Sequence, residues 1–126
     1  MPFVKVYLRR GKPPEYLRSV GDAIQEALVT TANVPEDDRF QVFHQLEDDA
    51  MVAHPTYGGV HRSRDLVIVE ITLNAGRTVE IKKNLYAKLA GRLETAVNLK
   101  PDDLLISLVE VTKENWSFGG GRATYA

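Results

Sequence analysis

The sequence predicts an α/β fold of the α+β type, in which two β-α-β units form a four-stranded sheet with two helices on one face. Short runs of β-branched and aromatic residues alternate with longer segments whose apolar residues recur every three or four positions. This order occurs twice in a chain of 126 residues, a length that suits one domain. A right-handed crossover in each unit then places both helices on the same face.

The first unit is predicted over the N-terminal third of the chain. Residues 4–8 have the composition of a short strand. Pro13 and Pro14 follow, and proline is favoured in the first turn of a helix. The apolar face of this helix is formed by Leu17, Val20, Ile24 and Leu28. We expect the helix to end near Asn33, which tolerates a left-handed conformation, and residues 40–44 to form the second strand.

The second unit repeats this pattern. Residues 66–71 form the predicted strand, and Thr78 is a helix N-cap. The apolar stripe of the helix consists of Ile81, Leu85, Leu89, Leu93 and Val97. We expect that helix to end near Asn98, and residues 104–109 to form the last strand.

Punctuating residues recur at nearly the same offset in the two units. Asn33 and Asn98 are each followed by a proline and an acidic pair, at Pro35 and at Pro101. Such a match indicates an internal repeat, covering about residues 2–46 and 66–112. We therefore expect one domain, residues 1–126. The face of its sheet that no helix covers would favour oligomerisation if it is apolar.

Composition excludes several classes of function. Sixteen basic and seventeen acidic residues give no field that would attract nucleic acid or an anionic membrane. Disulfides, thiolate nucleophiles and cysteine-based metal sites are excluded because the chain has no cysteine. The three histidines lack the spacing of metal ligands, so no metal site is predicted. No signal peptide or membrane span is apparent, and we expect a cytoplasmic protein.

Pro2 directly follows Met1, and a small residue at this position allows the methionine to be removed. Removal would leave a proline secondary amine at the N-terminus. This amine is a stronger base and nucleophile than an amide, and burial lowers its pKa by penalising the charged form. Pro2 is therefore a candidate catalytic acid or base.

The Met-Pro start, the duplicated β-α-β pattern and the segment 115–123 (NWSFGGGRA) are similar to those of the tautomerase superfamily. Within it, the chain most resembles the malonate semialdehyde decarboxylases, from Pro2 through residues 34–41 to this segment. The resemblance implies a tautomerase-like fold and a homotrimer whose subunits together line a pocket around the N-terminal proline. It also implies that no metal or organic cofactor takes part.

The resemblance extends to individual site residues. Pro2 matches the catalytic proline, and Asp38 matches an acidic residue that positions water or polarises the substrate carbonyl. Arg77 matches an arginine that holds the substrate carboxylate, as a planar guanidinium can. Aromatic pocket walls are matched by Trp116, Phe118 and Tyr125. The decarboxylases carry an Arg-x-Arg pair before the second helix, where this chain has Ala75-Gly76-Arg77.

These residues supply what proton transfer between carbon and oxygen of a keto acid requires, namely a base, a carboxylate anchor and a dry wall. We expect a cofactor-independent tautomerase-type enzyme that uses Pro2 on a small 2-keto, enol or 3-oxo carboxylic acid. One alternative is a malonate semialdehyde decarboxylase or hydratase, and another is a non-catalytic trimer that binds a ligand or a protein. The expected partners are a small carboxylate substrate and further copies of the chain, but neither nucleic acid nor membrane.

Each site residue also has a purely structural interpretation. Asp38 is a common type of turn residue. Arg77 could form a surface ion pair with Glu80 or Asp38, as exposed arginines often do. Trp116 and Phe118 could be ordinary packing residues.

Overall fold

The computed structural model describes residues 1–125. Its main elements are β1 (Pro2–Arg9), α1 (Pro14–Thr31), β2 (Gln41–Leu46), β3 (Val67–Asn74), α2 (Val79–Val97) and β4 (Leu104–Val111). Three short 3₁₀ turns accompany them: η1 (Asp48–Ala50), η2 (Pro101–Asp103) and η3 (Lys113–Asn115). The predicted order of two β-α-β units is therefore confirmed. Neither helix within the described residues is long and apolar enough to cross a membrane.

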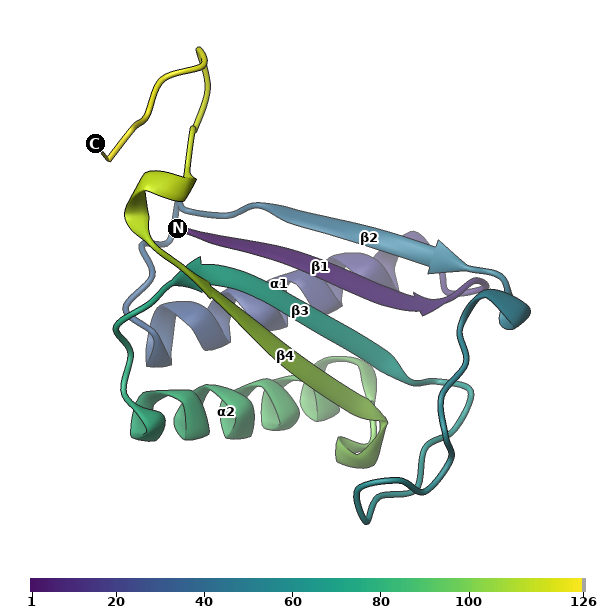
Figure 1. Ribbon diagram of the computed structural model, residues 1–126. Helices are drawn as coiled ribbons and strands as arrows, with labels where there is room; N and C mark the ends of the chain where they lie inside the picture. Colours follow the sequence, from purple (N-terminus) through teal and green to yellow (C-terminus); the bar gives the residue numbers. More distant parts are fainter. Residues whose placement is uncertain (126) are drawn as a thin grey trace.

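The four strands form one mixed sheet in the order β2-β1-β3-β4 (Figure 1). Within each unit the two strands are parallel, β1 with β2 and β3 with β4. The two units meet at the centre, where β1 and β3 are antiparallel and Pro2 lies opposite Leu73. As a result, the starts of β1 and β2 and the ends of β3 and β4 lie at the same end of the sheet.

Local signals in the sequence set the helix ends. The side chain of Thr78 accepts a hydrogen bond from the backbone N–H of Ile81 at 3.2 Å, as an N-cap does. Asn33 and Asn98 have φ values of 58° and 57°, the left-handed conformation expected where a helix ends. Both predicted helix ends are thus confirmed.

The core lies between the helices and one face of the sheet, so both helices cover the same face (Figure 1). Residues alternate between buried and partly exposed along β1 and β3, because successive side chains point to opposite faces. The fully buried side chains of the core include Val4, Val6, Ile24, Leu28, Ile71, Leu85, Leu89 and Leu93. Burial of each leucine or isoleucine contributes about 1.5–3 kcal/mol to stability.

The two central strands extend beyond their predicted limits at the end of the sheet where the chain begins. β1 starts at Pro2 rather than Val4, and β3 continues past Ile71 to Asn74. Thr72 and Asn74 are polar because they point to the face without helices, while Leu73 between them is buried. An apolar run in the sequence therefore ends before the strand does.

The uncovered face of the sheet is partly apolar. Val42 of β2 and Leu105 and Val109 of β4 expose 42%, 38% and 40% of their surfaces. The rings of Tyr7 on β1 and His44 on β2 stack with centroids 4.7 Å apart, and the Tyr7 hydroxyl donates to Glu70 of β3 at 3.5 Å. This face thus offers both apolar area and defined polar groups to another surface.

Candidate active site

A cavity of about 310 Å³ lies at the end of the sheet where the chain begins. Its lining residues come from β1, from the entry to β2 and from the segment after η3: Met1, Phe3, Phe40, Gln41, Val42, Trp116, Ser117 and Phe118. The polypeptide after β4 runs back to this end and rises above it (Figure 1). The cavity therefore has a largely aromatic and aliphatic wall beside the N-terminus.

Pro2 is buried at the start of β1, next to the lining residues Met1 and Phe3, but neither Pro2 nor Asp38 lines the cavity itself. The carboxylate of Asp38 faces Met1. The Met1 amine lies 3.2 Å from Oδ2 of Asp38. The other oxygen, Oδ1, is buried and accepts no hydrogen bond from any group within residues 1–125. Because buried polar atoms nearly always have a partner, this oxygen is available to a ligand or to an ordered water. In this form of the chain, Met1 makes the Pro2 nitrogen an amide, which has no basicity.

Asp38 is held by a turn that is itself fixed from α1. The backbone N–H of Asp38 donates to the carbonyl of Pro35 at 3.1 Å. Nε2 of Gln25, a buried residue of α1, lies 3.5, 3.3 and 3.1 Å from the carbonyl oxygens of Pro35, Glu36 and Asp38. Sequence reasoning missed Gln25. The sequence did contain one indication, because Gln25 is a polar residue that follows Ile24 on the buried side of the helix.

Arg77 binds backbone carbonyls rather than a carboxylate. Its Nε and Nη2 donate to the carbonyl of Ala32 at 3.0 and 2.8 Å, and Nη1 donates to the carbonyl of Asn74 at 3.1 Å. Ala32 is the C-cap of α1, where a positive charge is favoured by the helix dipole. The sequence suggested a surface ion pair with Glu80 or Asp38, but the guanidinium of Arg77 instead donates to these two backbone carbonyls. Arg77 is not among the residues that line the cavity.

The aromatic residues of the C-terminal segment contact one another in a chain. The ring centroids of Trp116 and Phe118 are 6.2 Å apart, and those of Phe118 and Tyr125 are 5.1 Å apart, both edge to face. Nε1 of Trp116 donates to Oδ1 of Asn74 at 2.7 Å. Trp116 and Phe118 line the cavity, whereas Tyr125 reaches it only through Phe118. Asn74, like Gln25, was missed from sequence.

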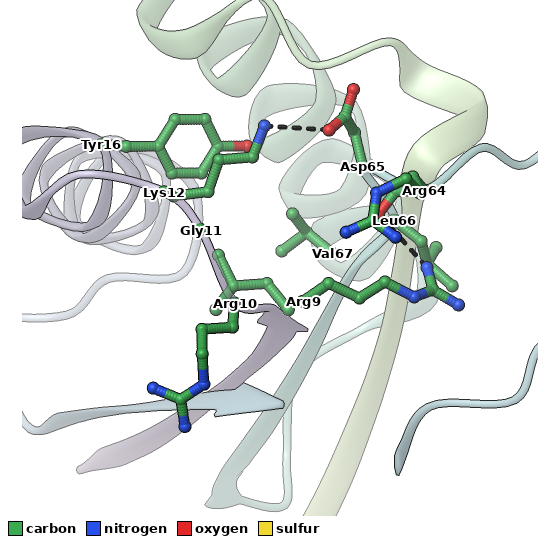
Figure 2. A pocket seen from close by; sticks show the side chains of 10 residues that line it. Arg9, Arg10, Gly11, Lys12, Tyr16, Arg64, Asp65, Leu66 and Val67 are labelled. Carbon is green, nitrogen blue, oxygen red and sulfur yellow. Dashed lines mark hydrogen bonds and ion pairs between the residues drawn. The ribbon is translucent and has the colours of Figure 1, made fainter. Parts of the chain in front are cut away.

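A second cavity, of about 230 Å³, lies at the opposite end of the sheet (Figure 2). Lys12 Nζ lies 2.9 Å from Asp65, and this hydrogen bond holds the pKa of Lys12 above its usual 10.5. Arg9 donates to the carbonyl of Arg64 at 3.2 Å, and Arg64 pairs with Asp48 at 2.7 Å. Lys12 and Arg64 are already paired with carboxylates, so an anionic substrate would have to displace Asp65 or Asp48 to bind them. The cavity beside Pro2 is the better candidate for the active site.

Two family models described as tautomerase enzymes match the chain, one over residues 38–119 and one over residues 2–60. The chain is similar to two proteins of Bacillus subtilis (strain 168). It is 38% identical to the probable tautomerase YusQ over 123 residues, which cover 98% of this chain and 97% of YusQ. It is 32% identical to the probable tautomerase YrdN over 125 residues, covering 99% and 96%.

Solved structures agree with these matches. FG41 malonate semialdehyde decarboxylase inhibited by 3-bromopropiolate has a TM-score of 0.90 at 30% identity, covering 98% of this chain and 93% of that one. A malonate semialdehyde decarboxylase studied for its decarboxylase and hydratase activities has a TM-score of 0.91 at 34% identity, covering 98% and 95%. A fused 4-OT symmetric trimer, with a TM-score of 0.80 at 21% identity and 98% and 97% coverage, shares the fold.

Proposed function

The chain belongs to the tautomerase family, and on this premise we propose that it interconverts the keto and enol forms of a small carboxylic acid, with Pro2 as the acid or base. The observation that carries the proposal is the position of Asp38: its Oδ2 lies 3.2 Å from the Met1 amine, and its Oδ1 has no hydrogen-bond partner within residues 1–125. No cofactor is needed for this chemistry, because a positioned acid or base suffices.

The active form in this proposal lacks Met1. Removal of the methionine turns the amide nitrogen of Pro2 into a secondary amine, buried at the start of β1 and close to Asp38. The neutral amine takes the hydroxyl proton of an enol, and the resulting ammonium delivers a proton to the carbon. Asp38 stabilises the ammonium by its charge, which is strongest in a site that excludes water.

We also assign roles to Arg77, which does not line the cavity, and to two aromatic residues that do. Arg77 uses three N–H groups on backbone carbonyls, and a guanidinium has five, so donors remain for a substrate carboxylate. Trp116 and Phe118 form a wall that excludes water from the enol. This aromatic wall favours a substrate with an apolar substituent, and the enol of phenylpyruvate is a suitable probe.

The alternative activity is decarboxylation or hydration of a 3-oxo acid. It is favoured by the likeness to the two malonate semialdehyde decarboxylase structures, with TM-scores of 0.90 and 0.91. Against it stands Ala75, which provides no charge at the position where the resemblance to the decarboxylases implies the first arginine of an Arg-x-Arg pair. A single anchor at Arg77 holds a carboxylate less firmly in line with the carbonyl than two cations would.

We also propose that the chain assembles as a trimer through the uncovered face of the sheet. Val42, Leu105 and Val109 provide the apolar area, which is favourable to bury. The fused 4-OT structure of the same fold is a symmetric trimer. A non-catalytic trimer that binds a ligand or a protein would use the same face, and it differs from the enzyme in needing no free amine at Pro2.

Turnover of the enol of phenylpyruvate by the processed protein tests the proposed activity. Pro2→Ala leaves a primary amine near the same place, and we expect kcat to fall by about 10²–10⁴-fold, the usual effect of losing a positioned acid or base. Val79→Ala, on the exposed side of α2, is the matched control and should retain the rate. Equal turnover by wild type and Pro2→Ala would reject the role of Pro2.

A further inference from the structure

Asn74, the last residue of β3, contacts two of the proposed site residues at once. Its side-chain Oδ1 accepts the hydrogen bond from Nε1 of Trp116 at 2.7 Å, and its backbone carbonyl accepts from Nη1 of Arg77 at 3.1 Å. Asn74 is the one described residue that hydrogen-bonds to both Trp116 and Arg77.

The chemistry of the two side chains fixes the orientation of the Asn74 amide. An indole N–H can only donate, so the carbonyl oxygen of the amide has to face Trp116, and its NH₂ group has to point away. Trp116 lies 42 residues further along the chain, beyond β4, in a segment without regular secondary structure. The short hydrogen bond that Trp116 donates to Asn74, at the end of β3, therefore fixes the Trp116 part of the cavity wall to the sheet.

We infer that Asn74 is a positioning residue that holds the Trp116 ring in the wall of the cavity and so sets how tightly substrate binds. This inference rests on the proposed function of the site. Without an acceptor at position 74, the indole N–H loses its partner and the ring turns toward solvent. The substrate then packs against a less ordered wall, which raises KM more than it lowers kcat, because Pro2 and Asp38 are untouched.

Fluorescence tests the contact without any substrate, since Trp116 is the only tryptophan of the chain. Asn74→Leu keeps the approximate shape and removes the acceptor. We expect its emission to shift to longer wavelength and its quenching by acrylamide to increase. Asn74→Asp keeps an acceptor and should retain the emission and quenching of the wild type. Unchanged emission and quenching in a folded Asn74→Leu protein would overturn the inference.

Steady-state kinetics with the enol of phenylpyruvate test the role in binding. Loss of one neutral hydrogen bond corresponds to a roughly two- to tenfold rise in KM for Asn74→Leu. In a Trp116→Phe background, which has no indole N–H, the same substitution should leave KM unchanged. An equal rise of KM in both backgrounds would overturn the inference, because Asn74 would then act through another group. Asn84→Leu, on the exposed side of α2, is the control for the substitution itself.

The two proposals fail in different ways. If the processed wild type does not turn over the enol, the proposed function fails, whatever the emission of Asn74→Leu. If the wild type is active and Asn74→Leu has an unchanged KM, the proposed function stands and the inference about Asn74 is wrong.

Discussion

The side-chain amide of Gln25 donates to the backbone carbonyl of Asp38 at 3.1 Å, and this contact connects the middle of α1 to the carboxylate beside the N-terminus. The same Nε2 also lies within 3.5 Å of the carbonyl oxygens of Pro35 and Glu36. One buried side chain of a helix thus holds the turn that presents Asp38. The turn places the Asp38 carboxylate 3.2 Å from the Met1 amine, directly before Pro2.

We predict that Gln25→Met, which has nearly the same length but no donor, loses about 1–3 kcal/mol of stability, because buried carbonyl groups are left without their partner. Urea unfolding should show a lower midpoint at an unchanged m-value. Gln45→Met, a similar change at a half-buried position of β2, is the control and should unfold near the wild type. A wild-type midpoint for Gln25→Met would show that the turn holds itself.

Arg77 has two roles in this account, one in stability and one in binding. Arg77→Ala should raise KM for a keto acid by about ten- to hundredfold, the effect of losing a charged hydrogen bond to the carboxylate. It should also lower the melting temperature, since the carbonyl groups of Ala32 and Asn74 lose their donors. Arg77→Lys keeps the charge but not the planar fork, so its KM should lie between those of wild type and Arg77→Ala. A wild-type KM in Arg77→Ala would leave Arg77 with a structural role alone.

Ala75 decides between the two proposed reactions. We predict that the wild type converts enol faster than it releases carbon dioxide from malonate semialdehyde at equal enzyme concentration. Ala75→Arg adds a second cation two residues before Arg77, in an exposed loop that has room for it, and should move the ratio toward carbon dioxide. Ala75→Gln, which is long but uncharged, should not. Efficient release of carbon dioxide by the unmodified protein would make decarboxylation the better assignment.

The uncovered sheet face should carry the trimer. Sedimentation of the wild type at micromolar concentration should give the mass of three chains. Val109→Lys, where the edge strand β4 contributes to that face, should dissociate the assembly because it buries a charge. Val79→Lys, at an exposed position of α2 outside that face, should remain a trimer. A monodisperse monomer of the wild type would reject this assembly.

The fold could be predicted from the sequence because its signals are local. Thr78, Asn33 and Asn98 mark helix ends by their own side-chain chemistry, and apolar spacing marks the buried helix faces. The contacts that build the site are not local. Gln25 meets carbonyl groups 10 to 13 residues away, and Asn74 meets Trp116 across 42 residues. The partners of Gln25 and Asn74 can be identified only when the positions of the strands and of the turn before β2 are known.

The partners of Arg77 could not be predicted from the sequence either. Its position before α2 indicated a cation at the end of the sheet, but sequence suggested carboxylate partners. The structure gives it the carbonyl of Ala32, which becomes accessible only because α1 ends beside the loop after β3. Backbone carbonyls at helix ends leave no trace in residue types, so this contact could not be read from the sequence.

The central claim is that catalysis requires the free amine of Pro2. Protein produced with Met1 intact can be treated with methionine aminopeptidase for increasing times, with intact-mass spectrometry and enol turnover measured on each sample. We predict that turnover is absent at the start and rises in proportion to the fraction of chains that have lost Met1. Turnover that is already complete in the uncleaved protein, or that does not change as Met1 is removed, would contradict the account.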